Sequence, residues 1–165
     1  MNNLISIITS QFKLSMNSVH GLSHWLRVEA LGQYLSATTE ADATVVRYFA
    51  YLHDSCRISE GEDLEHGKRA TGLIKELMEK GKISLTKEQG DVLKLACEVH
   101  NVTYTDPMDS TIATCLDADR LDLWRMGIEP SDKLLFTEVG KRISRDKALY
   151  DQIIGSATYK SSLRN

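Results

Sequence analysis

Apolar residues return every three or four positions along most of this chain, and this helical spacing is the strongest constraint on its fold. Runs in which polar and apolar residues alternate, as they do in strands, are few. Only two prolines, Pro107 and Pro130, are present to interrupt helices. The spacing predicts helices at 3–14, 22–36, 42–55, 64–80, 86–100, 110–126 and 131–154, with the last one broken near Gly140.

The length and composition fit one globular domain. The 165 residues are enough to bury a substantial core. Hydrophobic residues make up 42% and charged residues 26%, which is an ordinary balance. Thr86 and Gln89 have the spacing of a capping box at the start of the fifth predicted helix. Because no internal repeat, low-complexity segment or linker is evident, we expect an all-α fold in a single domain spanning residues 1–165.

The net charge and the length of the apolar segments indicate which partners and which cellular location to expect. The formal net charge is −3 and no basic run exceeds a few residues, so we expect no nucleic-acid-binding patch. No apolar segment has membrane-spanning length, and Met1 to Leu14 lack the basic start and long apolar stretch of a signal peptide. The three cysteines are odd in number and widely spaced, unlike a disulfide framework. We expect a cytoplasmic protein without a membrane partner, and oligomer formation is an open possibility.

Five of the predicted helices carry an imidazole or a carboxylate on the apolar stripe that faces the core. On the second predicted helix, for example, His24 shares its stripe with Val28, Leu31 and Leu35. The polar residues on the five stripes are His24, then His53 with Asp54 directly after it, then His66, His100 and Asp119.

Four histidines and two aspartates that face one core indicate a metal site. A lone histidine on an apolar face is usually a core residue with a satisfied hydrogen bond, so one such residue would mean little. Burying an unpaired carboxylate costs several kcal/mol, roughly, and a bound cation removes that cost. Histidine nitrogens and aspartate oxygens suit zinc, iron, manganese, cobalt or nickel, and carboxylates also suit magnesium.

These residues resemble the motifs of the HD superfamily of metal-dependent phosphohydrolases. The superfamily has a histidine on one helix, an adjacent His-Asp pair on the next, and an aspartate on a later helix. The matching segments here are Gly21-Leu-Ser-His-Trp-Leu-Arg-Val28, Tyr51-Leu-His-Asp-Ser55 and Asp117-Ala-Asp-Arg-Leu-Asp122. The resemblance covers about residues 18–126. It implies an HD-type helical bundle around a central metal site with His24, His53, Asp54 and Asp119 as ligands.

Some members of the superfamily hold a second metal on two further histidines, and His66 and His100 occupy those places in chain order. Two other interpretations stay open. His100 near a helix C-terminus is favoured by the helix dipole, and His66 in a first turn can be solvated. We therefore expect one or two metal ions per chain.

The neighbours of the motifs separate ligands from supporting residues and limit the substrate. Asp117 is nearly opposite Asp119 on its helix and should face away, whereas Asp122 can reach the site and hydrogen-bond to a ligand. The last motif looks like that of guanosine-polyphosphate hydrolases. However, the pair His53-Asp54 is followed by Ser-Cys-Arg57, which matches neither those hydrolases nor the cyclic-dinucleotide phosphodiesterases of the superfamily.

The resemblance implies hydrolysis of a nucleotide or another small phosphoester, as a monoesterase or a diesterase, by metal-activated water. Asp54 is a candidate for proton transfer as well as a ligand. Arg57, Lys68 and Arg69 are candidates to bind the substrate phosphate, although ordinary surface charge is the alternative for each. His20 is a candidate substrate contact.

Two other functions are compatible with such a chain. One is a non-catalytic HD-type module for signalling or binding, although the intact ligand set argues against it. The other is a di-iron oxygenase on the same scaffold, which requires His66 and His100 to hold a second iron.

Overall fold

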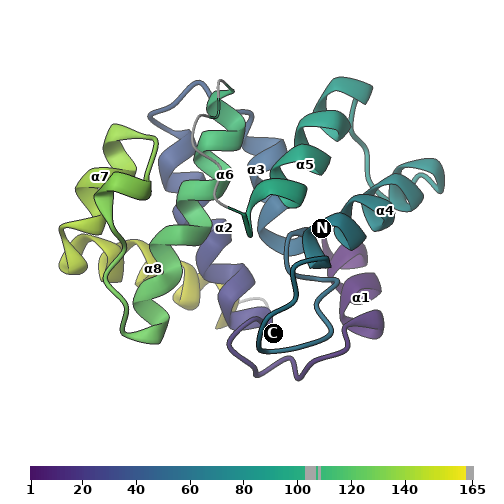
Figure 1. Cartoon of the computed structure of the whole chain (residues 1–165), viewed down its shortest axis with the longest axis horizontal. Coiled ribbons are helices and arrows are strands. Elements are labelled where there is room, and N and C mark those ends of the chain that lie inside the picture. The colour runs from purple at the N-terminus through teal and green to yellow at the C-terminus, as the bar shows by residue number, and fades with distance from the viewer. Residues whose placement is uncertain (103–106, 108, 163–165) are drawn as a thin grey trace.

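The computed structural model describes residues 1–102, 107 and 109–162, and these residues contain helices and no strand (Figure 1). The expected all-α class is therefore confirmed. The structure describes residues 18–126, the part of the chain that the resemblance covers, except for 103–106 and 108. These residues and 163–165 lie outside the described residues. The α-helices are α1 (Asn2–Gln11), α2 (Leu22–Ser36), α3 (Ala43–Leu52), α4 (His66–Glu79), α5 (Lys87–Val99), α6 (Ser110–Leu121), α7 (Glu138–Ser144) and α8 (Lys147–Ser162). Two short 3-10 helices, η1 (Asp122–Met126) and η2 (Asp132–Leu134), follow α6.

Helices α2, α3 and α6 form the centre of the bundle, as Figure 1 shows. Helix α2 packs against α3, α6 and α8, and α3 packs against α5 and α6. Helices α4 and α5 pack together on one side, while α7 and α8 lie on the opposite side. None of the described helices is long and apolar enough to span a membrane.

The core that holds these helices together is built from large side chains of α2, α3, α5 and α6. Trp25, Phe49, Leu52, Leu93 and Leu116 are fully buried. Each such side chain stabilises the fold by roughly 1.5–3 kcal/mol relative to its exposed state. Because the same four helices also carry predicted ligands, the packing of this core fixes where those ligands lie.

Side-chain caps set the starts of α3, α5 and α6. The expected capping box is confirmed, since the Thr86 hydroxyl accepts from the Gln89 amide and the Gln89 side chain accepts from Thr86 N. The Asp42 carboxylate caps α3 and the Asp109 carboxylate caps α6, each accepting two backbone N–H groups. These caps fix the register of the helices that lead to the predicted metal ligands.

The prediction for the C-terminal helix was wrong at its start, its break and its end. The segment 131–137 contains only the 3-10 helix η2, and α8 continues to Ser162. The predicted helix 131–154 was to be broken near Gly140, but Gly140 lies inside α7 and the break falls at Arg145 and Asp146. The Asp146 carboxylate accepts from Leu149 N at 3.0 Å and so starts α8. The glycine serves close packing instead, because a Cβ there would lie 2.6 Å from Oδ2 of Asp117.

Several predicted helices are shorter than expected, and the lost residues are functional candidates. Helix α3 ends at Leu52, so His53 and Asp54 lie just after its last turn. Helix α4 begins at His66, and α5 ends one residue before His100. Ligand candidates at helix ends are free to turn towards one point, which a continuous helix would not allow.

A glycine lets α4 approach α5 closely. A Cβ on Gly67 would overlap the backbone carbonyl oxygen of Cys97 on α5. Because His66 precedes Gly67, this approach also sets the position of the His66 ring. Gly72 lies on the same helix, but a Cβ there would meet no atom within 4 Å, so this glycine has no such role.

We therefore expect Gly67→Ala to lower the free energy of unfolding by roughly 2–3 kcal/mol, because the overlap must be relieved by moving backbone. Gly72→Ala on the same helix should instead raise it by about 0.5–1 kcal/mol, since alanine favours helix. Urea unfolding followed by circular dichroism measures both. Equal effects of the two substitutions would contradict the close approach of α4 and α5.

Candidate metal centre

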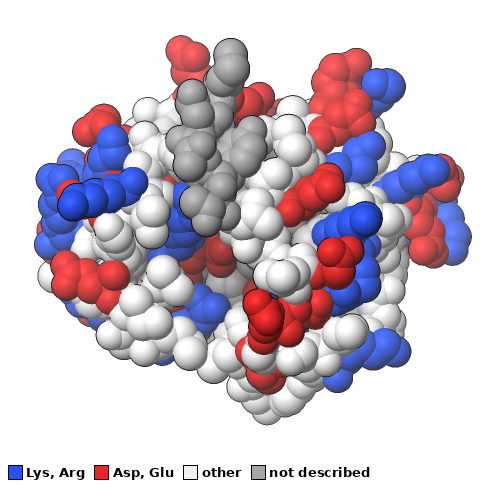
Figure 2. Space-filling view, in the orientation of Figure 1, with Lys and Arg blue, Asp and Glu red and all other residues white. Residues whose placement is uncertain are grey.

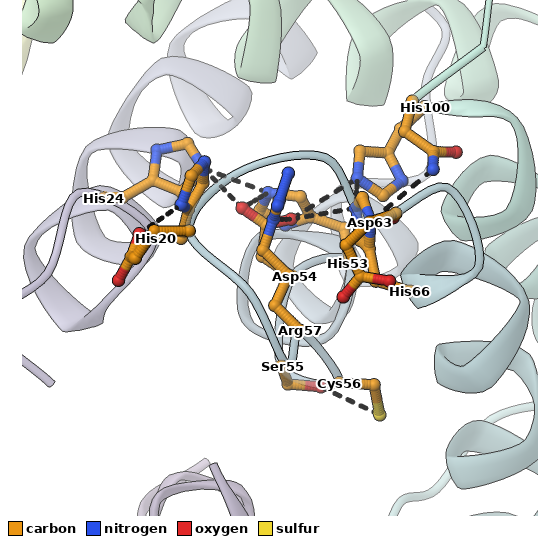
Figure 3. A network of polar contacts seen from close by, with 12 residues as sticks. His20, His24, His53, Asp54, Ser55, Cys56, Arg57, Asp63, His66 and His100 are labelled. Atoms are coloured by element: carbon orange, nitrogen blue, oxygen red, sulfur yellow. Dashed lines mark hydrogen bonds and ion pairs between the residues drawn. The ribbon is translucent and has the colours of Figure 1, made fainter. Parts of the chain in front are cut away.

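The structure brings all six predicted ligands to one place, where α2, α3, α4, α5 and α6 meet. His24 lies in the first turn of α2, and Asp119 lies in the last turn of α6. His24, His53, Asp54, His66 and His100 are buried, whereas the Asp119 side chain keeps 20% of its surface exposed. In Figure 3 Asp54 lies between His24 on one side and His66 and His100 on the other.

The first group of ligand atoms comes from His24, His53, Asp54 and Asp119. The two Nε2 atoms of His24 and His53 are 3.1 Å apart. Oδ2 of Asp54 lies 3.5 Å from Nε2 of His24 and 3.6 Å from Nε2 of His53. Oδ1 of Asp119 lies 3.4 Å and 3.6 Å from the same two nitrogens. Four potential ligand atoms thus surround one point.

The second group comes from His66, His100 and the other oxygen of Asp54. Nε2 of His66 and Nε2 of His100 are 2.8 Å apart. Oδ1 of Asp54 lies 3.1 Å from Nε2 of His66 and 3.5 Å from Nε2 of His100. The Asp54 carboxylate therefore spans the two groups and gives one oxygen to each.

Each of the four imidazoles is fixed by a hydrogen bond from its other nitrogen, Nδ1. A carbonyl or carboxylate oxygen can only accept, so Nδ1 carries a proton, and in the neutral imidazole Nε2 then carries a lone pair. The acceptors are Asp122 Oδ2 for His24 (2.7 Å), Phe49 O for His53 (3.0 Å), Asp63 O for His66 and Cys97 O for His100 (2.7 Å).

This donor set fits a metal ion. Two neutral imidazoles whose Nε2 lone pairs face each other cannot hydrogen-bond, because neither nitrogen has a proton to donate. Each pair therefore requires a proton or a metal ion between its members, and the carboxylates of Asp54 and Asp119 beside the first pair favour the greater charge of a metal ion. Three ligand atoms of His24, His53 and Asp119 lie within 4.8 Å of one another, as do those of His53, Asp54 and His100. Nitrogen and oxygen ligands in this mixture suit Zn, Mn, Fe, Co or Ni.

The electrostatics of the site also favour a cation. Burial lowers the pKa of His24, but hydrogen bonds to Asp119, Asp122 and Asp54 outweigh it and raise the pKa to about 10. Burial raises the pKa of Asp54 and Asp119, yet the surrounding histidines hold both well below the usual value. Without a metal, a proton therefore occupies the position between the carboxylates and His24.

The two neighbouring aspartates behave as expected. Asp122 is buried and accepts from His24 Nδ1, from Arg27 Nε at 2.8 Å and from the Tyr150 hydroxyl at 2.6 Å. Asp117 faces away from the site and accepts from the backbone amides before α7, including Thr137 N at 2.8 Å. Asp122 thus orients a ligand, while Asp117 anchors the C-terminal segment.

A cavity of about 260 Å³ opens onto the ligand groups. Its walls include three residues to which the sequence interpretation gave no role, namely Asn101, Arg120 and Arg125. The sequence did indicate that Arg120 lies near the site, because Arg120 directly follows Asp119 in the motif quoted above. In Figure 2 acidic and basic atoms lie together inside a hollow of the face shown, and charges of both signs are interspersed around it.

Two predicted substrate-binding residues line this cavity. Arg57 is in the wall, but its Nε donates to Asp54 Oδ1 at 3.1 Å and its Nη1 to two backbone carbonyls. The imidazole of His20 is also in the wall, and its Nδ1 donates to Glu60 Oε2 at 2.7 Å. Glu60 was not singled out from the sequence, because nothing in its local pattern marks it.

The other two predicted substrate-binding residues, Lys68 and Arg69, lie outside this cavity. Lys68 is on the exposed face of α4 and pairs with Glu65 at 3.8 Å. Arg69 donates to the Asp63 carboxylate and to the carbonyl of Cys56. Neither is among the described residues that line the cavity, so the geometry favours surface charge for Lys68 and loop anchoring for Arg69.

This chain is similar to a solved structure that is described as a predicted HD superfamily hydrolase from an uncultured Thermotogales bacterium. The TM-score is 0.70 and the identity is 20%, over 100% of this chain and 93% of the other. The chain therefore has the HD-domain fold, as its motifs imply. No protein-family model and no curated protein matches it.

We expect the purified protein to bind two divalent cations, and substitutions to remove them selectively. Asp54→Ala should abolish both, because each oxygen serves one group, whereas His66→Ala should remove one and Asp119→Ala the other. Elemental analysis of protein prepared without chelator measures the stoichiometry. His20→Ala is the matched control and should keep both ions. Retention of both ions by Asp54→Ala would refute the shared carboxylate.

Asp122, which hydrogen-bonds to the ligand candidate His24 without being one itself, provides a second test. Asp122→Asn removes the charge behind His24 and should weaken cation binding at the His24 group by about 10–100-fold. Binding at the His66 group should not change, since Asp122 does not contact it. Competition titration with a chromogenic chelator resolves the two affinities. Equal weakening of both sites would show that Asp122 acts through the fold as a whole.

Proposed function

We propose that this protein is a metal-dependent phosphohydrolase that acts on a nucleotide or another small phosphoester. The observation that carries the proposal is the position of Asp54, which faces two histidine pairs at the base of a cavity with arginines in its walls. The description of the similar structure, a predicted HD superfamily hydrolase, supports the same class of reaction.

The chain's residues divide into two ligand groups in this proposal. His24, His53, Asp54 and Asp119 hold one ion, and His66, His100 and Asp54 hold the other. When bound, a divalent ion supplies a Lewis acid and a water of lowered pKa. Asp54 and Asp119 neutralise only half the charge of two divalent ions, so the site attracts a phosphate dianion.

Arg120 is the best candidate to bind the substrate phosphate. Arg57 pairs with Asp54 and Arg125 with Asp122, so both guanidinium groups already have carboxylate partners. In the described part of the chain Arg120 has no carboxylate partner of that kind, and its Nη1 donates only to the carbonyl of Leu134. Its remaining N–H groups have no hydrogen-bond acceptor among the described residues and can donate to phosphate oxygens.

Asp54 and His20 are the two candidates for proton transfer. Both Asp54 oxygens face histidine nitrogens, which favours a bridging ligand over a free proton acceptor. His20 lines the same cavity, and Glu60 orients its ring through Nδ1. Burial lowers the pKa of His20, so its ring is neutral at pH 7 and suited to accept a proton from water.

A di-iron oxygenase would need the same two ligand groups, and a binding module would need none of them. The arginines in the cavity wall favour an anionic substrate, which a phosphoester provides. This is why we place hydrolysis ahead of the oxygenase. The complete set of six ligands supports catalysis over a purely structural role.

The test is a panel of nucleotides and simple phosphoesters assayed with manganese, cobalt and nickel. Wild-type protein should release phosphate, and Asp54→Ala and Asp119→Ala should not. Arg120→Ala should raise the Michaelis constant by about ten- to a hundredfold, since a hydrogen bond to a charged group contributes roughly 1.5–3 kcal/mol. Lys68→Ala, which removes an exposed charge outside the cavity, is the control and should leave kcat and the Michaelis constant unchanged.

Two outcomes would contradict the proposed reaction, and a third would change the role of one residue. Two equivalents of iron with oxygen consumption would establish the oxygenase. Absence of any bound metal would favour the binding module. Hydrolysis that Arg120→Ala does not affect would remove Arg120 from the phosphate site, although not the reaction itself.

A further inference from the structure

A second cavity of about 410 Å³ adjoins the one at the metal centre. The two cavities lie side by side, because they share four wall residues. The shared residues are His100, Asn101, Arg120 and Leu123. The volume lies within the range of about 300–1,000 Å³ that is typical of small-molecule sites.

The walls of this second cavity are mainly apolar. Val102, Leu123, Pro130, Leu134 and Phe136 provide the apolar surface, and we call this set the apolar groove. Besides the three polar residues that both cavities share, Ser131 and Lys133 also line the wall. Val102 is 47% exposed and Leu134 is 57% exposed. Large apolar side chains that gather around a concavity and stay exposed to water are characteristic of a binding surface.

Arg120 stands where the two cavities join. Its guanidinium lies over the Phe136 ring at 5.0 Å from the ring centre, and its Nη1 donates to the carbonyl of Leu134. These two contacts hold the guanidinium at the junction. A phosphate at the metal centre and a ring in the apolar groove would therefore both lie beside Arg120.

We propose that the apolar groove is the subsite for a flat, apolar ring system of the substrate, which makes the substrate a phosphoester with an aromatic or heteroaromatic group. This inference rests on the proposed function, since it takes the phosphate to lie at the metal centre. Three observations carry it: the shared walls, the apolar lining and the position of Arg120. A cavity of about 410 Å³ suits one group of a small molecule.

Binding of two phosphonates to the metal-loaded protein tests the subsite without requiring turnover, because their P–C bond is not hydrolysed. Benzylphosphonate should bind about twentyfold more tightly than methylphosphonate, as burial of a phenyl ring predicts. Leu134→Ser should reduce this preference by about three- to fivefold and leave methylphosphonate binding unchanged. Isothermal titration calorimetry measures all four affinities.

Ile128→Ser is the matched control, because Ile128 is an exposed apolar residue (52%) outside both cavities. It should leave the preference intact. Equal affinity of the two phosphonates, or equal effects of Leu134→Ser and Ile128→Ser, would overturn the subsite.

The two proposals fail in different ways. If methyl phosphate and benzyl phosphate are both hydrolysed with the same kcat/KM, and the phosphonates bind equally, the apolar groove is not a subsite and the hydrolase stands. If no phosphoester is hydrolysed with any divalent metal, the proposed function fails, and the subsite for a phosphoester fails with it.

Discussion

The structure of the site depends on one buried carboxylate. Asp54 directs one oxygen to His24 and His53 and the other to His66 and His100, so four imidazoles from four segments are arranged around a single side chain. A buried negative charge of this kind is stable only among donors or cations. The helices that bring the histidines are therefore constrained to meet at Asp54, and the cavity opens where they meet.

The fold class and the six polar residues that face the core could be predicted from periodicity, whereas their roles as metal ligands were implied by the resemblance to the HD superfamily. A histidine on an apolar stripe must face the core, and five stripes that face one core must bring their polar residues together. Helix boundaries were less accurate. His53, His66 and His100 were placed inside or near helices, and they lie at helix ends, where hydrogen bonds to local carbonyls compete with the next helical turn.

The walls of the cavity could not be predicted in the same way. Lys68 and Arg69 were chosen for their nearness to His66 in sequence, but both turn away to local acidic partners. Arg120 and Arg125 follow Asp119 on α6 and η1. The position of Arg120 depends on the segment that carries Leu134, and that of Arg125 depends on the carbonyl of Val19. The positions of such surface side chains depend on contacts between segments that are distant in the sequence, and the periodicity of the sequence does not reveal these contacts.

The four Nδ1 hydrogen bonds are not equivalent, and the difference bears on how the site can evolve. For His53, His66 and His100 the acceptor is a main-chain carbonyl, which no substitution removes. For His24 it is the carboxylate of Asp122, itself held by Arg27 and Tyr150. Selection can therefore adjust the basicity of His24 by point mutation at three positions, whereas the other imidazoles have a fixed electronic character. Divergence in metal preference among descendants of this chain would begin at the His24 side of the centre.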